Sequence, residues 1–458
     1  YDRMYYEGFE PEKATMISIL KSCGISTLIS YGRLVNYTII RSGFEQDVIV
    51  GNSLVDMYCK CGSLIEAQTV FQTMTIHNVV SWNALIAGYV HHGCNLYALE
   101  IFDEMQKEGL LPDRITFSCI LKACTRLGSI LEGKRVHEKL VKDGFQMSMV
   151  VGSTLVDMYA KCGHIEEACE VFDKMPNRGL FSWGAMIAGY TLQGDSYKAL
   201  DLYWKMVSEY VKPDKVTLLC VLKACCSMGA LGQGKLIHME IVQNNLEIDV
   251  AIGSLLVDMY SKLGLLEDAQ NVLQSMPDRN IVVWNAMIGG YAQQGHWKQA
   301  WKCTKDMQKE GFRPVHRTYS NLLAAFSHAG ELEEGHRSLK LMIDEGDMVL
   351  TIEHLNCVID LLGRAGWLGE AIKMLQSIPN LSSIIGRMSL LTACKTYGQT
   401  DLARACFDEI VNLNPNIGVG DTVLSNIYVD SQKLQDLKEF EELRKWKIAQ
   451  DNDVYEVL

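Results

Sequence analysis

Apolar residues recur along this chain at helical spacing. The first half of residues 79–113 has them at i, i+3, i+4 and i+7: Trp82, Leu85, Ile86 and Tyr89. That spacing puts all four on one face of a helix, and Ser81 is placed to cap its first turn. A break at residues 92–95 precedes a second apolar stripe, which Gly109 and Pro112 bring to an end. Residues 79–113 are therefore predicted to form a hairpin of two helices.

The pattern repeats at a step of 101 residues, as the positions of Trp82, Trp183 and Trp284 show. Each step divides into two hairpins of 35 residues and one of 31. The predicted hairpins are 13–47, 48–78, 79–113, 114–148, 149–179, 180–214, 215–249, 250–280, 281–315, 316–351 and 352–383. One such hairpin is too small to bury both of its stripes, so its neighbours must cover them. The sequence predicts an all-α fold, a right-handed superhelical solenoid of stacked two-helix hairpins.

Composition narrows the class of protein. No run of about 18 apolar residues occurs, so no segment is predicted to span a membrane. The 15 cysteines lack paired spacing and are predicted to be buried thiols of a reducing compartment. A net charge of −12 argues against a surface that binds any polyanion by charge alone, although half of the excess lies in residues 401–458. Because the chain opens inside the tail of a hairpin, we expect any targeting peptide to precede Tyr1.

Two helical-repeat families fit this pattern. Tetratricopeptide repeats carry the helix W-x2-L-G-x2-Y, but Ile86 stands where that template has glycine. The segments VVSWNALIAGY, GNSLVDMYCKCGSLIEA and EHLNCVIDLLGRAGWLGEA, and the Pro-Asp ending of residues 79–113, resemble the plant pentatricopeptide repeat family instead. The resemblance covers essentially the whole chain and is to the subclass that alternates long, short and standard hairpins. It implies an organellar protein that binds single-stranded RNA, one base per hairpin.

The resemblance also implies which residues read a base. In that family the fifth residue of a hairpin and its last residue act together, and an Asn at the fifth position can both donate and accept hydrogen bonds. The matching pairs are Asn83 with Asp113, which implies uracil, Asn52 with Asn78, which implies a pyrimidine, and Ser254 with Asn280, which implies adenine. Further candidates at these two positions are Ser118, Ser153, Asp214 and Asn285.

Two more sets of residues are implied to contact RNA. Apolar side chains at the second position of a hairpin are candidates to sandwich bases: Ile49, Val80, Val150, Phe181 and Val282. Basic side chains at the ninth position, one helical turn beyond the fifth, or at the start of a long hairpin are candidates for phosphate contacts: Lys21, Lys122, Lys223, Arg114 and Lys215. An ordinary solvated or capping side chain is the alternative role for each of these positions.

Some hairpins depart from the reading pattern. Gly184 is the fifth residue of hairpin 180–214, and Gly179 is the last residue of hairpin 149–179. Val315 stands where an Asp would be expected beside Asn285. Base reading is therefore expected to be patchy, and hairpins 180–214 and 281–315 should be nearly indifferent to the base.

The ends of the chain differ from its middle. Residues 1–12 are interpreted as the tail of a truncated repeat and 13–383 as the repeat array. Residues 384–458 resemble the two extension motifs of organellar RNA-editing factors, which recruit a cytidine deaminase, although Arg387 stands where that pattern favours Trp. A zinc deaminase needs H-x-E followed by C-x-x-C, and only His238-Met239-Glu240 is present, inside a repeat. We predict no metal, no cofactor and no catalysis by this chain.

The leading interpretation is a single-stranded RNA-binding protein that recognises sites for organellar C-to-U editing, with a deaminase acting in trans. The resemblance places it in a mitochondrion or a chloroplast, with the mitochondrion preferred. One alternative is a structural RNA-binding subunit of an organellar ribonucleoprotein such as a ribosome. Another, from a different class, is a helical-repeat scaffold that binds protein in its groove.

Overall fold

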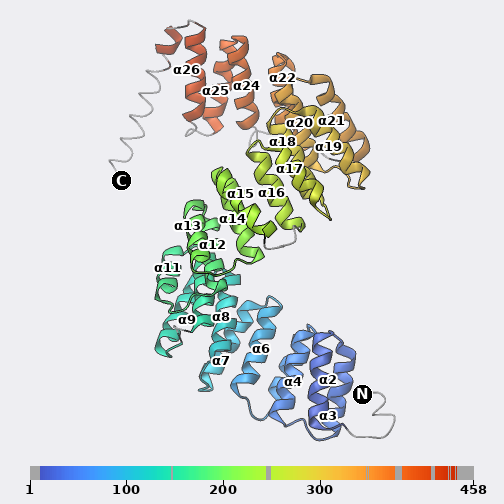
Figure 1. The fold of residues 1–458 in the computed structure, drawn as a ribbon, viewed down its shortest axis with the longest axis vertical. Coiled ribbons are helices and arrows are strands. Elements are labelled where there is room, and N and C mark those ends of the chain that lie inside the picture. Colours follow the sequence, from blue (N-terminus) through green and yellow to red (C-terminus); the bar gives the residue numbers. More distant parts are fainter. Residues whose placement is uncertain are drawn as a thin grey trace. The chain divides into compact units, whose positions relative to one another are not determined.

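The computed structural model describes residues 11–145, 148–243, 249–346, 348, 350–376, 384–413, 418–431, 433, 435–438 and 440. Two compact units divide the chain, Tyr1–Met228 and Gly229–Leu458, and each is a stack of two-helix hairpins (Figure 1). Even-numbered helices are the first helices of their hairpins, and odd-numbered helices are the second. The boundary between the units falls inside hairpin 215–249.

In the first unit, the first helices are α2 (Lys13–Ile25), α4 (Val48–Lys60), α6 (Val79–His91), α8 (Arg114–Leu127), α10 (Met149–Lys161), α12 (Leu180–Gln193) and α14 (Lys215–Met228). The second helices are α3 (Ile29–Arg41), α5 (Leu64–Thr73), α7 (Asn95–Lys107), α9 (Ile130–Lys142), α11 (Ile165–Lys174) and α13 (Ser196–Ser208). Each predicted hairpin of this unit begins at the residue where a first helix begins.

In the second unit, the first helices are α16 (Val250–Lys262), α18 (Ile281–Gln293), α20 (His316–Ala329), α22 (Ile352–Arg364), α24 (Ile384–Tyr397) and α26 (Gly418–Asp430). The second helices are α15 (Leu231–Gln243), α17 (Leu266–Ser275), α19 (Trp297–Lys309), α21 (Leu332–Gly346), α23 (Leu368–Gln376) and α25 (Thr400–Leu413). Within each unit a first helix packs against the first helices of both neighbouring hairpins, and a second helix packs against the first helix of its own hairpin and of the next.

The last residue of a hairpin can cap the first helix of the next one. Asp113 is the N-cap of α8, and its Oδ1 accepts a hydrogen bond from the N–H of Thr116 at 2.8 Å. Asn78 caps α6 in the same way, accepting from the N–H of Ser81 at 3.0 Å. The prediction that Ser81 caps this helix is wrong, because α6 already begins at Val79. The Ser81 hydroxyl instead accepts a hydrogen bond from the Asn78 N–H at 3.1 Å, which completes a capping box.

The core is built from the predicted stripes. Trp82, Trp183 and Trp284 are 2%, 1% and 5% exposed, which confirms that this face points inward. The period of 101 residues also has a packing reason. A Cβ placed on Gly133 of α9 would lie 2.5 Å from Sδ of Met158 on α10, so the two helices can approach this closely only at a glycine. The same contact recurs between Gly32 and Met57 and between Gly234 and Met259.

A partly buried hydrogen bond repeats with the same period. The Tyr159 hydroxyl lies 2.9 Å from Nδ1 of His137, and the Tyr260 hydroxyl lies 2.9 Å from Nδ1 of His238. Burial lowers the pKa of both histidines and raises the pKa of both tyrosines to about 12, so all four side chains are neutral at pH 7. The histidine of the H-x-E motif therefore has a packing role.

The C-terminal helices continue the stack. Residues of α24, α25 and α26 share one hydrophobic core with Ile359, Ala371 and Leu375 of the preceding hairpin. Arg387 of α24 occupies the register of the buried tryptophans and is itself only 8% exposed. Its Nε donates a hydrogen bond to Oε2 of Glu409 on α25 at 2.7 Å, so a paired guanidinium replaces the aromatic ring. Residues 441–458 of the predicted extension lie outside the described residues.

None of the described helices is both long enough and apolar enough to cross a lipid bilayer.

Candidate nucleic-acid interface

Within each unit, the second position of a hairpin recurrently carries an uncovered apolar side chain, and these positions are called the second-position row. Five predicted members have nearly equal exposed fractions: Ile49 57%, Val80 58%, Val150 59%, Phe181 57% and Val282 57%. A single exposed aliphatic residue is ordinary on a protein surface. The same exposure at the same position of five hairpins is not ordinary. Each of these five hairpins keeps one apolar side chain available for a partner.

Asn83 is held by residues outside its own helix. Its Nδ2 donates a hydrogen bond to Oδ1 of Asp113 at 3.0 Å, and its Oδ1 accepts one from the Thr116 hydroxyl at 2.6 Å. The side chain is 7% exposed. Since a carboxylate only accepts hydrogen bonds, the amide nitrogen must be the atom that faces Asp113. One N–H of the amide and one lone pair of its oxygen are left for a further partner.

Asp113 is ionised by the same contacts. Burial opposes its charge and is the largest influence, but hydrogen bonds from Thr116, Asn83 and the Ile115 N–H outweigh it. The pKa of Asp113 therefore lies below its ordinary value. Hairpin 79–113 thus presents a fixed amide backed by a carboxylate.

The short hairpin before it has a weaker version of this arrangement. Nδ2 of Asn52 donates to Oδ1 of Asn78 at 3.3 Å, and Asn78 also caps α6. Oδ1 of Asn52 is buried without a hydrogen-bond partner. A buried acceptor without a partner is costly in the free protein, so a donor from a bound molecule would stabilise this site.

The other predicted pairs are not joined in this way. The Ser254 hydroxyl donates to the carbonyl of Val250 in its own helix, while Asn280 caps α18 through the N–H groups of Val282 and Val283. The Ser153 hydroxyl likewise donates to the Met149 carbonyl, at 2.6 Å. The hydroxyl oxygen of Ser118 is buried without a partner.

Hairpins 180–214 and 281–315 each keep part of the Asn83 arrangement. In the first, Asp214 caps α14 and accepts from the Thr217 hydroxyl at 2.6 Å, but Gly184 supplies no amide. In the second, the Thr318 hydroxyl donates to Oδ1 of Asn285 at 2.7 Å, but Val315 supplies no carboxylate.

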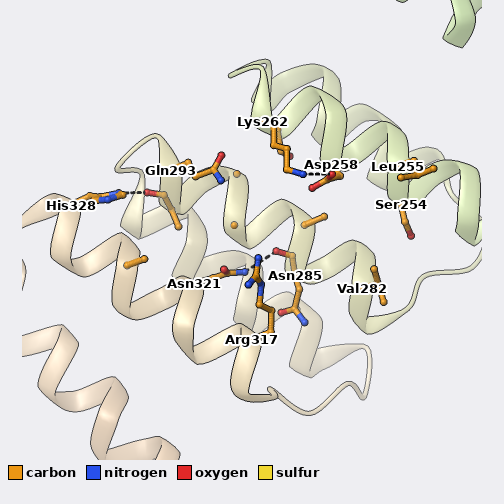
Figure 2. A pocket seen from close by; sticks show the side chains of 16 residues that line it. Ser254, Leu255, Asp258, Lys262, Val282, Asn285, Gln293, Arg317, Asn321 and His328 are labelled. Atoms are coloured by element: carbon orange, nitrogen blue, oxygen red, sulfur yellow. Dashed lines mark hydrogen bonds and ion pairs between the residues drawn. The ribbon is translucent and has the colours of Figure 1, made fainter. Parts of the chain in front are cut away.

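A cavity of about 640 Å³ lies on the first-helix face of the second unit, lined by α16, α18 and α20. Figure 2 shows Asn285, Arg317 and Asn321 close together in its middle, with Ser254 and Val282 toward one end. The Asn321 amide donates to the Asn285 carbonyl oxygen at 3.0 Å. Residues from positions two, five and nine of consecutive hairpins therefore meet on one hollowed surface.

The predicted phosphate contacts lie at the surface. Lys21, Lys122, Lys223 and Arg114 are exposed, and none of them forms an ion pair with another residue that the structure describes. Lys215 is also exposed. Lys13, which begins a long hairpin as Arg114 does, is instead paired with Asp47 at the end of that hairpin.

Comparison with known families explains why this register recurs. A model described as PPR repeat family matches residues 77–126 and 279–328. A model described as PPR repeat matches residues 52–79, 115–145, 153–180, 181–211, 254–281, 317–347 and 353–381. Together these matches cover more than half of the chain. The chain belongs to the pentatricopeptide repeat family.

Pentatricopeptide repeat proteins of Arabidopsis thaliana resemble the chain over nearly its whole length. The chloroplastic protein CRR2 is 33% identical over 96% of this chain and 68% of its own length. A putative mitochondrial relative is 32% identical over 97% of this chain and 74% of its own length. Another chloroplastic relative is 34% identical over 93% of this chain. The chain spans about half (49%) of that relative and 63% of a further one.

Solved structures show the same fold. A crystal structure of the pentatricopeptide repeat protein PPR10 in complex with an 18-nt psaJ RNA element is similar with a TM-score of 0.70, at 16% identity, over 96% of this chain and 74% of that one. A structure of PPR10 from maize is similar with a TM-score of 0.52, at 19% identity, over 99% of this chain and 71% of that one. The predicted fold class, an all-α solenoid of stacked hairpins, is confirmed.

Sequence reasoning missed several residues of this pentatricopeptide repeat surface. Ile115 and Val216 continue the second-position row, each 60% exposed, and their register alone would have found them. Ser320 and Asn356 are fifth residues, both 8% exposed, and each has a side-chain oxygen buried without a partner. No sequence pattern signals an unsatisfied atom, because the neighbour that fails to satisfy it lies in another hairpin.

Within the described ranges, no three His, Cys, Asp or Glu side chains lie close enough to share an ion. Cys59 and Cys61, which end α4, are free thiols, and burial raises the pKa of Cys59 to about 12.

Proposed function

We propose that this chain binds single-stranded RNA on the faces formed by its first helices, and that it selects sites for organellar C-to-U editing with a deaminase acting in trans. Hairpins 79–113 and 48–78 supply base contacts, and the second-position row sandwiches the bases. Lys21, Lys122, Lys223, Arg114 and Lys215 supply phosphate contacts.

One observation carries the proposal: the amide of Asn83 is fixed by Asp113 and Thr116 with a donor and an acceptor left over. A side chain with only a packing role would not need a donor and an acceptor that lack partners. Similarity in fold to a protein whose crystal structure holds an 18-nt RNA element supports a nucleic-acid partner. The resemblance to the family assigns uracil to the Asn83 and Asp113 pair.

Selection from a randomised RNA pool by the purified chain tests base reading. We expect uracil at the position bound by hairpin 79–113. Asn83→Thr, with Asp113 left in place, should move that preference toward purine, because the family pairs Thr and Asp with guanine. One base contact is worth about 1–3 kcal/mol, so selection at this position should change about fivefold or more. A pool that returns no preference at any position would contradict base reading.

A second candidate function is a structural RNA-binding role in an organellar ribonucleoprotein. The glycine at position 184 and the valine at position 315 favour it, because each removes half of a reading pair. Purification of the tagged protein from plant organelles separates the two candidates. Recovery with a deaminase supports the editing role, whereas recovery in stoichiometric amounts with a ribosome supports the structural one.

The organelle belongs to the same proposal. Chloroplastic and mitochondrial relatives match with similar identity, 33% and 32%, so similarity favours neither compartment. Fractionation of plant cells that carry the tagged full-length protein would decide between them.

A further inference from the structure

Thr116 lies between the two residues assigned to base reading. It is the third residue of α8, fully buried, and its Oγ1 is 2.6 Å from Oδ1 of Asn83 and 2.9 Å from Oδ1 of Asp113. The hydroxyl has a single proton to donate. Oδ1 of Asp113 already accepts three N–H groups, from Asn83, Ile115 and Thr116 itself. The shorter contact and the less crowded acceptor both direct the proton to Asn83.

Hairpin 180–214 shows where the same hydroxyl points when there is no amide. Its fifth residue is Gly184, and Oγ1 of Thr217 lies 2.6 Å from Oδ1 of Asp214. In hairpin 281–315 the amide is present and the carboxylate is absent, and Oγ1 of Thr318 lies 2.7 Å from Oδ1 of Asn285. The threonine hydroxyl thus bonds the amide in hairpins 79–113 and 281–315, which both have one. In hairpin 48–78 the third residue of the following helix is Ser81, whose hydroxyl donates to Oδ1 of Asn78 and leaves Oδ1 of Asn52 without a partner.

Hairpin 352–383 shows what happens without the hydroxyl. The third residue of the following helix is Gly386, and Oδ1 of Asn356 is buried without a partner. A Cβ placed on Gly386 would lie 2.9 Å from that oxygen. The amide oxygen therefore points at the space that a threonine fills in the other two hairpins.

We propose that Thr116 is a positioning residue for base reading, so that the reading unit of hairpin 79–113 has a third member supplied by the next hairpin. This inference rests on the proposed function. Asp113 on its nitrogen and Thr116 on its oxygen favour the same orientation of the Asn83 amide. A turned-over amide would face its oxygen toward the carboxylate and would lose the hydrogen bond from Thr116, so each partner adds to the cost of turning over.

A fixed amide separates the two pyrimidines. Uracil offers an acceptor, O4, beside the N3–H donor, whereas cytosine offers a donor, the N4 amino group, beside the N3 acceptor. An amide of one fixed orientation matches only one of these orders. An amide that can turn over matches both, and then uracil and cytosine bind alike.

The test compares Thr116→Val with Thr217→Val in the full chain. Both threonines are fully buried, both sit at the third position of a helix, and the N–H of each donates to the capping carboxylate. Only Thr116 also bonds an amide, so Thr217→Val reports the structural cost alone. Affinity is measured for RNAs that differ only by uracil or cytosine at the position bound by hairpin 79–113, and urea unfolding gives the stability of each variant.

Thr116→Val should reduce the preference for uracil over cytosine at that position about fivefold. Thr217→Val should leave that preference unchanged at a similar loss of stability. A gain-of-function arm uses Gly184→Asn, which places an amide beside Asp214 and Thr217. That variant should acquire a uracil preference at the RNA position bound by hairpin 180–214, and the double variant with Thr217→Val should show a smaller one.

The inference is overturned if Thr116→Val keeps the wild-type ratio, or if Thr217→Val lowers it equally. In both cases the wild-type chain still prefers uracil, and base reading by the proposed pair stands. A wild-type chain with no preference between uracil and cytosine would overturn the proposed function, and the inference with it.

Discussion

Hairpins 79–113 and 281–315 have the same core and differ at the face proposed to read bases. Trp82 and Trp284 occupy the same register and are 2% and 5% exposed. The residues that end the two hairpins have nearly the same backbone conformation, with φ −105° and ψ −176° at Asp113 and φ −116° and ψ 175° at Val315. Each has an N–H that donates to a threonine hydroxyl at 3.1 Å. What hairpin 281–315 lacks is the carboxylate.

The difference shows that the residues that stack the hairpins are separate from those proposed to read bases. The apolar stripes fix the helices, because each stripe must be covered by a neighbouring hairpin. The side chain at the end of a hairpin adds a cap and a hydrogen bond to the fifth residue, and the fold survives without either. If the proposed function holds, a repeat can therefore lose base preference while its neighbours keep theirs.

The largest expected effect should be the same in both hairpins. Trp82→Ala and Trp284→Ala should each lower the free energy of unfolding by about 3–5 kcal/mol, because each leaves a cavity between hairpins. Urea or thermal unfolding of the two variants measures this. A loss below about 1 kcal/mol for either one would show that its tryptophan does not belong to the shared core.

Asp113→Val removes the carboxylate that hairpin 79–113 has and hairpin 281–315 lacks. It removes the cap of α8 and the partner of the Asn83 nitrogen, so the free energy of unfolding should fall by about 2 kcal/mol. The uracil preference of hairpin 79–113 should fall with it, and preferences at other RNA positions should not. An unchanged preference would mean that Asp113 caps the helix and does nothing else.

The same variant predicts a pH dependence. The pKa of Asp113 is lowered on folding, so its contribution to stability is complete above the unfolded pKa of about 3.9 and is lost as the pH falls through the folded value. The difference in unfolding free energy between wild type and Asp113→Val should therefore stay constant between about pH 5 and 8 and shrink in stronger acid. If the difference in unfolding free energy grew in acid, the pKa of Asp113 would have to be raised on folding, and the prediction would be wrong.

The sequence predicted the fold better than the site. Hairpin boundaries follow from a 101-residue period, and the register of the second-position row follows from the boundaries. The third member of the reading unit could not be found in this way, because Thr116 is 33 residues from Asn83 and its spacing from Asp113 is that of an ordinary capping box. Burial of Arg387 was equally unpredictable, since its partner Glu409 is 22 residues away.

Val315→Asp should repair the second hairpin. The backbone of residue 315 already has the conformation of a cap, and Thr318 already holds the Asn285 oxygen. A carboxylate there should cap α20 and raise the free energy of unfolding by about 1 kcal/mol. It should also accept a hydrogen bond from Nδ2 of Asn285. Selection from a randomised pool should then show a uracil preference at the position bound by hairpin 281–315. A gain in stability without any preference would show that the amide needs more than its two partners.

The smallest expected effect concerns the charge at the ninth position of hairpins 114–148 and 316–351, which follow the two hairpins compared above. Lys122 is the exposed ninth residue of the hairpin that follows 79–113. Ala324 occupies the same position in the hairpin that follows 281–315, and it lines the cavity of the second unit. A phosphate contact releases counterions, so each contact adds about 0.7 to the slope of log affinity against log salt for a single strand. Lys122→Ala should flatten that slope by about 0.7, and Ala324→Lys should steepen it by the same amount. Neither should alter base preference, because phosphate contacts are the same for every sequence. The measurement is a salt titration of binding to one fixed RNA. If Lys122→Ala leaves the slope unchanged while Asp113→Val abolishes selection, hairpin 79–113 reads a base without holding the adjacent phosphate, and the two regions differ in the carboxylate alone.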